Sequence, residues 1–557
     1  MKKPALKKPT LKKPELSLKR PGPAALGGAS RTGVSLLAAA GVLVLVLGVA
    51  EARPPAAPAG PAAGAAVTAQ VERTAAVCPQ PMQGLTGTTT ITALTPGAGG
   101  STAGGSGTVT VVNPPTPVAA APSPAPSGAP AGSPPPSPAA SAPAAPAPAA
   151  GQAPPAPALL TLTKPGVPVS VQAPGGDTAP GSSAVATGAY APGFTVTQTT
   201  IVTDQRGMGM SGVTCQPDGT DFWFAGAAAA GDRADYVDLT NVGAASAVVD
   251  IKLYGAQGEV DSDAAAGIAV PPGGSQAVLL STLTNNTAVN DLAVEVVARS
   301  GRISANLHAS DGSNGSDWIP ASVAPAPSQV LAGLPADLSA MRLIVMAPGG
   351  DDADLKIQLS GQNGWFTPAG HETIHVKAGM VNAVDLGQIT RGEVSALRLT
   401  PSDPQNATPV VAGLRVDRGG SGKSDSAWLT GSLPIGQRAT VADVRGGGAS
   451  TLYLTATGDA ATVRVTASAG TGGGTPTTKD VQVPAGATVS LPSPEPAGGT
   501  GNFGVSLQTL TGGPVVAARM LAVNTNSVPM FTIQALNDDH SNVVVPQADQ
   551  DPGILAH

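Results

Sequence analysis

The chain has 557 residues, and its 71 glycines and 56 prolines interrupt it too often for a conventional helical protein. Charged residues make up only 12% of it, which excludes a nucleic-acid binder with a basic face. The net charge of −6 is unevenly placed, because a basic head of nine Lys or Arg and one Glu in residues 1–33 precedes an acidic remainder. All 14 aromatic residues lie at or beyond Tyr190, so a large core is expected only in the C-terminal two-thirds.

An apolar stretch of 17 uncharged residues, 34–50, follows the basic head. It is at the short end of what spans a hydrocarbon core about 30 Å thick. The lysines before it predict that the N-terminus stays in the cytoplasm and that the rest is exported. We therefore predict a cytoplasmic tail at 1–33, a single-pass transmembrane signal anchor at 34–50 in the cell membrane, and a linker at 51–70. Ala50-Glu51-Ala52 also has the form of a cleavage site, so a cleaved signal peptide is the alternative.

Export also bears on the two cysteines, Cys78 and Cys215. An even count in an oxidising compartment predicts one disulfide between them. Two unpaired buried thiols are the alternative. Neither cysteine has a Cys-x-x-Cys partner or a nearby histidine, so zinc binding and thiol redox chemistry are not expected.

Residues 71–230 combine short β-like runs with a Pro/Ala-rich insert at 114–157 that contains no charged residue. Such a composition cannot bury enough apolar surface to order itself. We predict one disulfide-closed β-domain at 71–230, interrupted by a disordered spacer at 114–157. A ligand for a proline-recognising domain is the less favoured interpretation of the insert.

The remainder of the chain is repetitive. Val270-Pro-Pro-Gly-Gly274, Val376-Lys-Ala-Gly-Met380 and Val483-Pro-Ala-Gly-Ala487 recur at one pitch, and each follows an alternating strand. Short alternating runs and frequent turn signals, such as the Asn363-Gly364 pair typical of a type I′ hairpin, are the pattern of sandwiches. We predict an all-β protein with about three immunoglobulin-like β-sandwich repeats, at 231–335, 336–440 and 441–545, and a tail at 546–557.

The chain resembles a family of actinobacterial, membrane-anchored exported proteins that share a domain of unknown function. The resemblance rests on the segments around the two cysteines and on the start of the first repeat, namely Arg73-Thr-Ala-Ala-Val-Cys-Pro79, Cys215-Gln-Pro, Phe222-Trp-Phe-Ala-Gly226 and Tyr236-Val-Asp-Leu-Thr-Asn241. It covers roughly residues 70–545. It implies a location in the cell envelope and supplies no catalytic residues.

One motif suggests an enzyme. His371-Glu-Thr-Ile-His375 matches the His-Glu-x-x-His pattern, which binds zinc when a helix places both imidazoles on one face. Pro368 and Gly370 precede the motif, and it aligns with β segments of the other repeats, so a strand is expected instead. In a strand the two histidines would lie about 13 Å apart, too far to share a metal. We predict no enzymatic activity, no cofactor and no metal site.

Two equivalent Asp-rich loops, Asp311–Asp317 and Asp417–Asp425, precede Trp318 and Trp428. Their oxygens could hold Ca²⁺, but a polar hairpin loop is the favoured interpretation. We expect the two tryptophans to fill the sandwich cores.

The candidate surface-binding residues are Trp365 and Phe366, because adjacent aromatic residues in a strand point to opposite faces and one would be exposed. We expect a non-enzymatic envelope protein, a scaffold or interaction stalk. A glycan-binding module, which requires an exposed aromatic cluster, and a hydrolase, which requires converging catalytic groups, are the alternatives. The expected partners are the membrane and either cell-wall polysaccharide or another envelope protein, and no nucleic acid.

Overall fold

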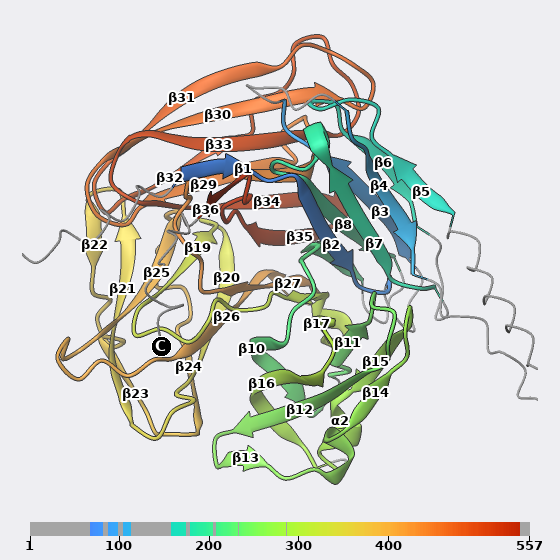
Figure 1. The fold of residues 1–557 in the computed structure, drawn as a ribbon. Helices are drawn as coiled ribbons and strands as arrows, with labels where there is room; N and C mark the ends of the chain where they lie inside the picture. The colour runs from blue at the N-terminus through green and yellow to red at the C-terminus, as the bar shows by residue number, and fades with distance from the viewer. Residues whose placement is uncertain are drawn as a thin grey trace, which may run out of the picture. The chain divides into compact units, whose positions relative to one another are not determined.

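The computed structural model describes residues 67–81, 87–97, 104–112, 157–173, 179–203, 208–231, 233–285, 287–420 and 422–545. These residues form an all-β protein, as predicted, with four β-sandwiches (Figure 1). Among the described residues, helix is confined to α2 (Leu280–Leu283) and three single turns, Gly188–Tyr190, Asp263–Ala265 and Gly312–Asn314. The predicted tail 1–33, anchor 34–50, tail 546–557 and nearly all of the insert 114–157 lie outside the described residues. Within the described ranges, no helix is long and apolar enough to cross a membrane.

The strands of the four sandwiches follow one another along the chain. Sandwich 1 contains β2 (Arg73–Cys78), β3 (Gly87–Leu94), β4 (Gly107–Val111), β5 (Ala158–Thr161), β6 (Val169–Gln172), β7 (Ser182–Thr187), β8 (Thr195–Val202) and β9 (Gly209–Thr214). Sandwich 2 contains β10 (Asp221–Ala229), β11 (Tyr236–Thr240), β12 (Ala247–Gly255), β13 (Gly258–Val260), β14 (Ile268–Val270), β15 (Ser275–Leu279), β16 (Val289–Ser300), β17 (Ser304–Ser310) and β18 (Ser316–Ile319).

Sandwich 3 contains β19 (Gln329–Leu334), β20 (Leu338–Met346), β21 (Ala353–Gly361), β22 (Gly364–Phe366), β23 (Thr373–Val376), β24 (Val381–Asp385), β25 (Ser395–Pro401), β26 (Val411–Gly420) and β27 (Lys423–Thr430). Sandwich 4 contains β28 (Ala439–Val444), β29 (Ser450–Ala456), β30 (Ala461–Gly470), β31 (Thr477–Val483), β32 (Thr488–Pro492), β33 (Phe503–Gly512), β34 (Val515–Thr525) and β35 (Val528–Ala535). Outside the sandwiches, β1 (Val67–Gln70) pairs with β36 (Asn542–Val545).

All four sandwiches have the same strand order. If the strands of each are numbered 1 to 8, one sheet has the order 1-6-3-4 and the other 5-2-7-8; in sandwiches 2 and 3 the fourth strand is two short pieces on the same edge. Alternating residues on both sheets point inward and fill an apolar core in each sandwich. The core of sandwich 3 is continuous with buried residues of sandwich 4, among them Tyr453 and Phe531. The β-domain predicted at 71–230 is therefore a fourth copy of the repeat rather than a different domain.

The strand order differs from that of a seven-stranded immunoglobulin domain, whose sheets are ABED and CFG. When the fourth and fifth strands are set aside, the remaining six pair as 1-6-3 and 2-7-8. These are the pairings of strands B-E-D and C-F-G in the immunoglobulin order. Each sandwich thus keeps that six-stranded centre and adds one strand to an edge of each sheet.

The Pro/Ala-rich insert lies between β4 and β5, which pair through Thr108 with Thr161 and Val109 with Leu160. The insert therefore replaces a hairpin loop, and both of its ends start from one edge of one sheet. Because the entropy of closing a loop grows only slowly with its length, a long insertion at this place costs little stability. It also breaks the spacing of the first copy, which is why the repeat is visible in the sequence only from the second copy onward.

The strands also begin earlier than the domain boundaries that we predicted. Phe222-Trp-Phe-Ala-Gly226, expected at the end of the first domain, lies in β10 and is the first strand of sandwich 2. Phe224 is fully buried in the core of that sandwich. Likewise sandwich 3 begins at Gln329 and not at 336. The shared sequence markers lie in later strands of each copy, so they give the pitch of the repeat without locating its first strand.

The Asn363-Gly364 hairpin forms between β21 and β22, with Gly361 opposite Gly364. Its turn is not the predicted type I′, which needs a positive φ at both loop residues. Neither Gln362 nor Asn363 has one, whereas Gly364 has a φ of 111°. The glycine after the turn therefore takes the conformation that was expected within the loop.

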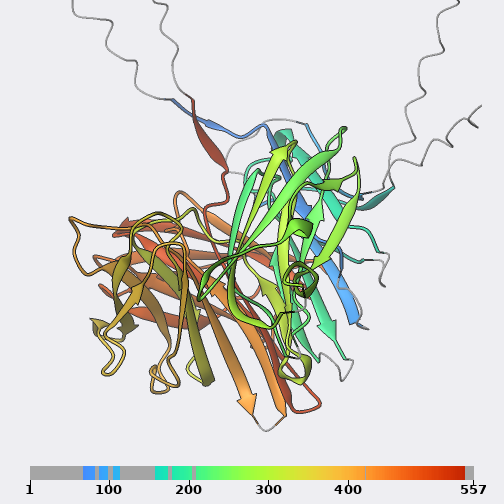
Figure 2. The ribbon, with the colours of Figure 1, turned by 90° about the horizontal axis from the view of Figure 1, so that it is seen from below.

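The last strands of the four sandwiches, β9, β18, β27 and β35, meet at one centre. Each contacts the next in this order, and β35 returns to contact β9. Sandwich 1 thus packs against sandwich 4 as well as against sandwich 2, and Figure 2 shows its blue and teal strands beside the green strands of sandwich 2. The described sandwiches form a closed set and not a linear stalk.

Two buried aspartates hold this centre together. Asp425 of β27 accepts hydrogen bonds from the backbone N–H of Met210 in β9 (3.0 Å) and of Phe531 in β35 (2.8 Å). Asp317 of β18 accepts one from the backbone N–H of Gly212 in β9 (2.8 Å). Burial raises the pKa of both carboxyls well above the usual value, although these hydrogen bonds oppose the rise. Two of the four central strands therefore supply acceptors for backbone donors of the other two.

The disulfide joins Cys78, at the end of β2, to Cys215, directly after β9, across 137 residues. It ties the first strand of sandwich 1 to its last. Both cysteines are buried in the core of that sandwich.

Candidate functional site

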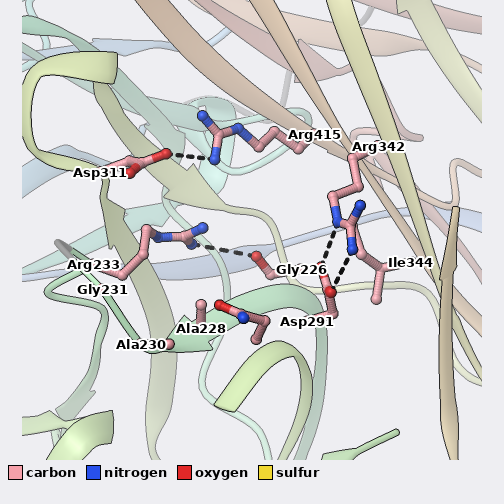
Figure 3. A pocket seen from close by; sticks show the side chains of 11 residues that line it. Gly226, Ala228, Ala230, Gly231, Arg233, Asp291, Asp311, Arg342, Ile344 and Arg415 are labelled. Atoms are coloured by element: carbon pink, nitrogen blue, oxygen red, sulfur yellow. Dashed lines mark hydrogen bonds and ion pairs between the residues drawn. The ribbon is translucent and has the colours of Figure 1, made fainter. Parts of the chain in front are cut away.

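A cavity of about 440 Å³ lies between sandwiches 2 and 3 (Figure 3). This volume is in the range of small-molecule sites, roughly 300–1,000 Å³. Small residues of β10 and the turn after it, among them Gly226 and Ala230, leave the space open. The charged residues that line it are Arg233, Asp291 and Asp311 from sandwich 2 and Arg342 and Arg415 from sandwich 3.

Arg233 is fixed by a buried carboxylate two residues later. Its Nε and Nη2 donate to the two oxygens of Asp235, at 2.9 and 2.5 Å. Asp235 also accepts from the backbone N–H of Ala228 (2.8 Å) and of Ser310 (3.1 Å), so it joins three strands of sandwich 2. Burial raises the pKa of Asp235 even though Arg233 opposes the rise. The guanidinium beside the cavity is therefore held in one position.

Trp428 forms the floor behind this arginine. It is fully buried, and the guanidinium carbons of Arg233 and Arg415 lie 5.4 and 5.5 Å from its ring centroid. Contacts at this distance are attractive cation–π interactions. The indole Nε1 donates to the carbonyl oxygen of Gly226 (3.3 Å), whose φ is 113° and whose missing side chain leaves room for the ring. The tryptophan that we expected to fill a core therefore also supports two arginines between the sandwiches.

Two ion pairs cross from one sandwich to the other beside the cavity. Arg342 of β20 donates through Nε and Nη2 to Asp291 of β16, at 2.7 and 2.6 Å. Arg415 of β26 pairs through Nη1 with Asp311 (2.5 Å) and through Nε with Asp417 (2.8 Å). Figure 3 shows both pairs facing the same space as Arg233. A molecule bound there would contact both sandwiches.

Hydrogen bonds to Asp291 raise the pKa of Arg342, and Asp385 adds to the effect. At Arg415 burial pulls the pKa down, but the charges of Asp417 and Asp311 outweigh burial and raise it. The three guanidinium groups at the cavity pair with five carboxylates in all. Arg342 pairs with Asp385 (2.6 Å) in addition to Asp291. The cavity therefore offers donors and acceptors close together and no excess of positive charge.

Sequence reasoning did not identify these arginines. A usable signal was present in Arg415-Val-Asp417 of β26, because residues two apart in a strand share one face, and Arg233-Ala-Asp235, in the segment before β11, has the same spacing. Arg445, which pairs with Asp443, belongs to the same pattern. In a chain with so few charges, such pairs mark the places where charged groups are buried.

The predicted binding residues Trp365 and Phe366 lie elsewhere, in β22. The guanidinium of Arg398 stacks on the Trp365 ring at 4.2 Å, and a Cβ added to Gly486 of sandwich 4 would lie 2.8 Å from that ring. Trp365 is thus half-buried, whereas Phe366 is 41% exposed. Within the described ranges, Phe366 is the single aromatic residue among the exposed large apolar side chains.

The His-Glu-x-x-His motif lies in a turn followed by β23, so its histidines do not share a helix face. Nδ1 of His375 is 2.8 Å from Oδ1 of Asp354 on the exposed surface. Backbone hydrogen bonds from Gly370 lower the pKa of the exposed Glu372. In the part of the chain that the structure describes, no group of three or more His, Cys, Asp or Glu side chains is arranged to hold a metal ion.

The two Asp-rich loops come together, because the hydroxyl of Ser426 donates to the carbonyl oxygen of Asn314 (2.9 Å). Their four end residues have separate roles. Asp311 and Asp417 pair with Arg415 at the cavity, whereas Asp317 and Asp425 bind backbone donors at the centre. Three of these four carboxylates, Asp311, Asp317 and Asp425, therefore join sandwiches, whereas Asp417 binds residues of its own sandwich.

Asp238 of β11 is a further buried carboxyl, where sandwich 2 contacts the segment after Cys78. Its Oδ1 accepts from the hydroxyl of Thr240 (3.2 Å), and the carboxyl also accepts from the backbone N–H of Gln80. Burial raises the pKa of Asp238 to about 7. The folded state therefore binds this proton more tightly than the unfolded state does, so stability falls as pH rises from about 4 to about 7 and is lowest above 7.

We expect Asp238→Asn to remove this loss of stability with rising pH, because an amide does not ionise. The free energy of unfolding at pH 8 should rise by up to about 4 kcal/mol. Urea unfolding at pH 5 and pH 8 measures the free energy of unfolding. The increase in the variant over the unmodified protein should be much smaller at pH 5 than at pH 8. Asp480→Asn is the control, because the ion pair of Asp480 with Arg464 lowers the pKa of that exposed carboxyl. An equal gain at both pH values would contradict the assignment.

The fold and the cavity define a class of protein: four sandwiches of one topology, closed on themselves, with a polar cavity between the second and third. A family model described as a family of unknown function (DUF5719) matches residues 169–494, and the chain belongs to this family. The match begins at β6 and includes the whole of sandwiches 2 and 3, and hence the cavity. No curated protein and no solved structure matches the chain significantly.

Proposed function

We propose that the protein is a non-enzymatic, membrane-anchored scaffold of the cell envelope, with its N-terminus in the cytoplasm and its four sandwiches outside. The closed packing of the sandwiches carries the proposal, because the buried aspartates Asp317 and Asp425 fix the sandwiches relative to one another. A rigid set of this kind is suited to hold a partner. The Lys-rich head, the apolar run 34–50 and the disulfide support export.

The packing favours a compact scaffold over an extended stalk. In a stalk each repeat would contact only its neighbours. Here β9 and β8 of sandwich 1 contact β35 and β28 of sandwich 4. The immunoglobulin-like centre of each sandwich is consistent with an adhesive role, since that architecture presents loops at both ends.

Protease treatment of intact cells that produce the full chain tests the location. We expect externally added proteinase to degrade the sandwich region while a tag on the first residues stays protected. A chain released into the medium would instead support cleavage after the apolar run. A sandwich region that becomes sensitive only after lysis would contradict the proposal.

The scaffold role is tested by photo-crosslinking in the same cells, with the crosslinking residue at the exposed Phe366. One recurrent envelope protein in the crosslinked product supports a protein-binding scaffold. Crosslinks to cell-wall polysaccharide alone support the alternative, a glycan-binding protein. The control for nonspecific crosslinking places the crosslinking residue at Asp480, an exposed position on sandwich 4.

A further inference from the structure

The cavity between sandwiches 2 and 3 has the chemistry of a ligand site, and the geometry points to a neutral saccharide as its ligand. This inference goes beyond the proposed scaffold function and does not depend on it, and it places glycan recognition away from Trp365 and Phe366. Its argument uses the two ion pairs that cross between the sandwiches, Arg342–Asp291 and Arg415–Asp311.

An arginine–aspartate pair at the edge of a cavity presents an N–H donor beside a carboxylate acceptor. A sugar hydroxyl both donates and accepts hydrogen bonds, so two neighbouring hydroxyls of one ring match one such pair. The cavity has two pairs of this kind, and Arg233 adds a third guanidinium that Asp235 holds in place. The amide of Asn290, which also lines the cavity, supplies both a donor and an acceptor.

Charged ligands match this lining less well. A phosphate or carboxylate can only accept hydrogen bonds, so it would bind the guanidinium groups and be repelled by Asp291 and Asp311. An ammonium or guanidinium group can only donate and would be repelled by Arg233, Arg342 and Arg415. Each arginine that lines the cavity has a carboxylate partner, and each lining carboxylate, Asp291 and Asp311, has an arginine partner, so neither kind of ion finds an unpaired opposite charge.

The size and lining of the cavity also favour a saccharide. The walls are lined by small residues, Gly226, Ala228, Ala230 and Gly231, and the volume of about 440 Å³ is at the lower end for small-molecule sites. That space suits a short saccharide segment and not a folded partner. Because the lining comes from both sandwiches, a bound sugar would also bridge them.

The test is isothermal titration of the detergent-solubilised full chain, disulfide intact, with three kinds of probe. These are a panel of neutral disaccharides of glucose, galactose and mannose, inorganic phosphate, and arginine methyl ester. We expect at least one neutral disaccharide to bind, and both ions to bind at least tenfold more weakly. Tighter binding of phosphate or of the arginine ester would overturn the inference, and so would the absence of binding by the whole disaccharide panel.

Ala230→Leu fills the cavity without removing a charged group, and Arg464→Ala changes an exposed ion pair of sandwich 4. We expect the first to weaken disaccharide binding at least tenfold and the second to leave it unchanged, with thermal melting to verify that both fold. Unchanged binding in Ala230→Leu combined with loss in Phe366→Ala would move the site to β22. If protease accessibility places the sandwiches outside the cell while no saccharide binds, the scaffold proposal stands and the saccharide inference fails.

Discussion

Replacing Asp425 with alanine is expected to lower the free energy of unfolding by roughly 3–6 kcal/mol. The change removes the acceptor for three buried backbone N–H groups, those of Met210, Phe531 and Ser426. Each buried donor left without a partner costs about 1–3 kcal/mol. Because these donors belong to β9, β35 and β27, the loss weakens three sandwiches at their common centre. Urea or guanidinium unfolding of the full chain measures it.

Asp425→Asn is the matched variant. Burial raises the pKa of Asp425 well above its usual value, and its hydrogen-bond donors are backbone N–H groups, so an amide replaces the carboxyl without removing an ion pair. The amide keeps one acceptor oxygen, so we expect less than half the loss seen with alanine. The exposed Asp480→Ala should change stability by less than about 1 kcal/mol. Equal losses for Asp425→Ala and Asp480→Ala would show that the centre does not hold the sandwiches together.

The second large effect is expected from the disulfide. Replacing both Cys78 and Cys215 with alanine should lower the free energy of unfolding by about 5 kcal/mol in the chain-entropy account, because the bond closes a loop of 137 residues. Reduction of the unmodified protein should produce a similar loss, whereas the double variant should not respond to reductant. A stability that reductant leaves unchanged would contradict this.

The insert provides an internal comparison for the same bond. Deleting residues 114–156 shortens the closed loop by roughly a third, and the logarithmic dependence on loop length then reduces the contribution of the disulfide by only about 0.3 kcal/mol. The deletion variant should therefore lose nearly as much stability on reduction as the full chain. A much smaller loss would mean that the insert, and not the sandwich around it, determines the effect of the bond.

Local patterns predicted several features well. Period-two alternation, frequent Gly and Pro and the recurrent markers predict all-β repeats, because strand geometry places every second side chain on one face. The same reasoning places His371 and His375 outside a zinc-binding helix, and β23 is indeed a strand. Trp318 and Trp428 are buried, but neither fills the core of its own sandwich as expected: Trp318 packs with Val213 of sandwich 1, and Trp428 packs with the core residues of sandwich 2.

Other features depend on contacts between segments far apart in the chain. The fourth copy is hidden by the insert between β4 and β5, since pairing of Val109 with Leu160 is invisible to any count of spacing. One of Trp365 and Phe366 was expected to be exposed; it is Phe366, because Arg398 and Gly486 of another sandwich lie against the Trp365 ring. No local pattern carries that information.

The sequence by itself therefore determined the strand character, the repeat, the basic head with its apolar run, and the presence of two cysteines in one chain. The tertiary structure decided which charged side chains meet. Arg342 finds Asp291 and Arg415 finds Asp311 only because a sheet of sandwich 2 packs against a sheet of sandwich 3, and Asp425 reaches Met210 only because four last strands converge. The physical reason is that strand formation depends on neighbours along the chain, whereas the partner of a buried charge is set by the packing of whole sandwiches.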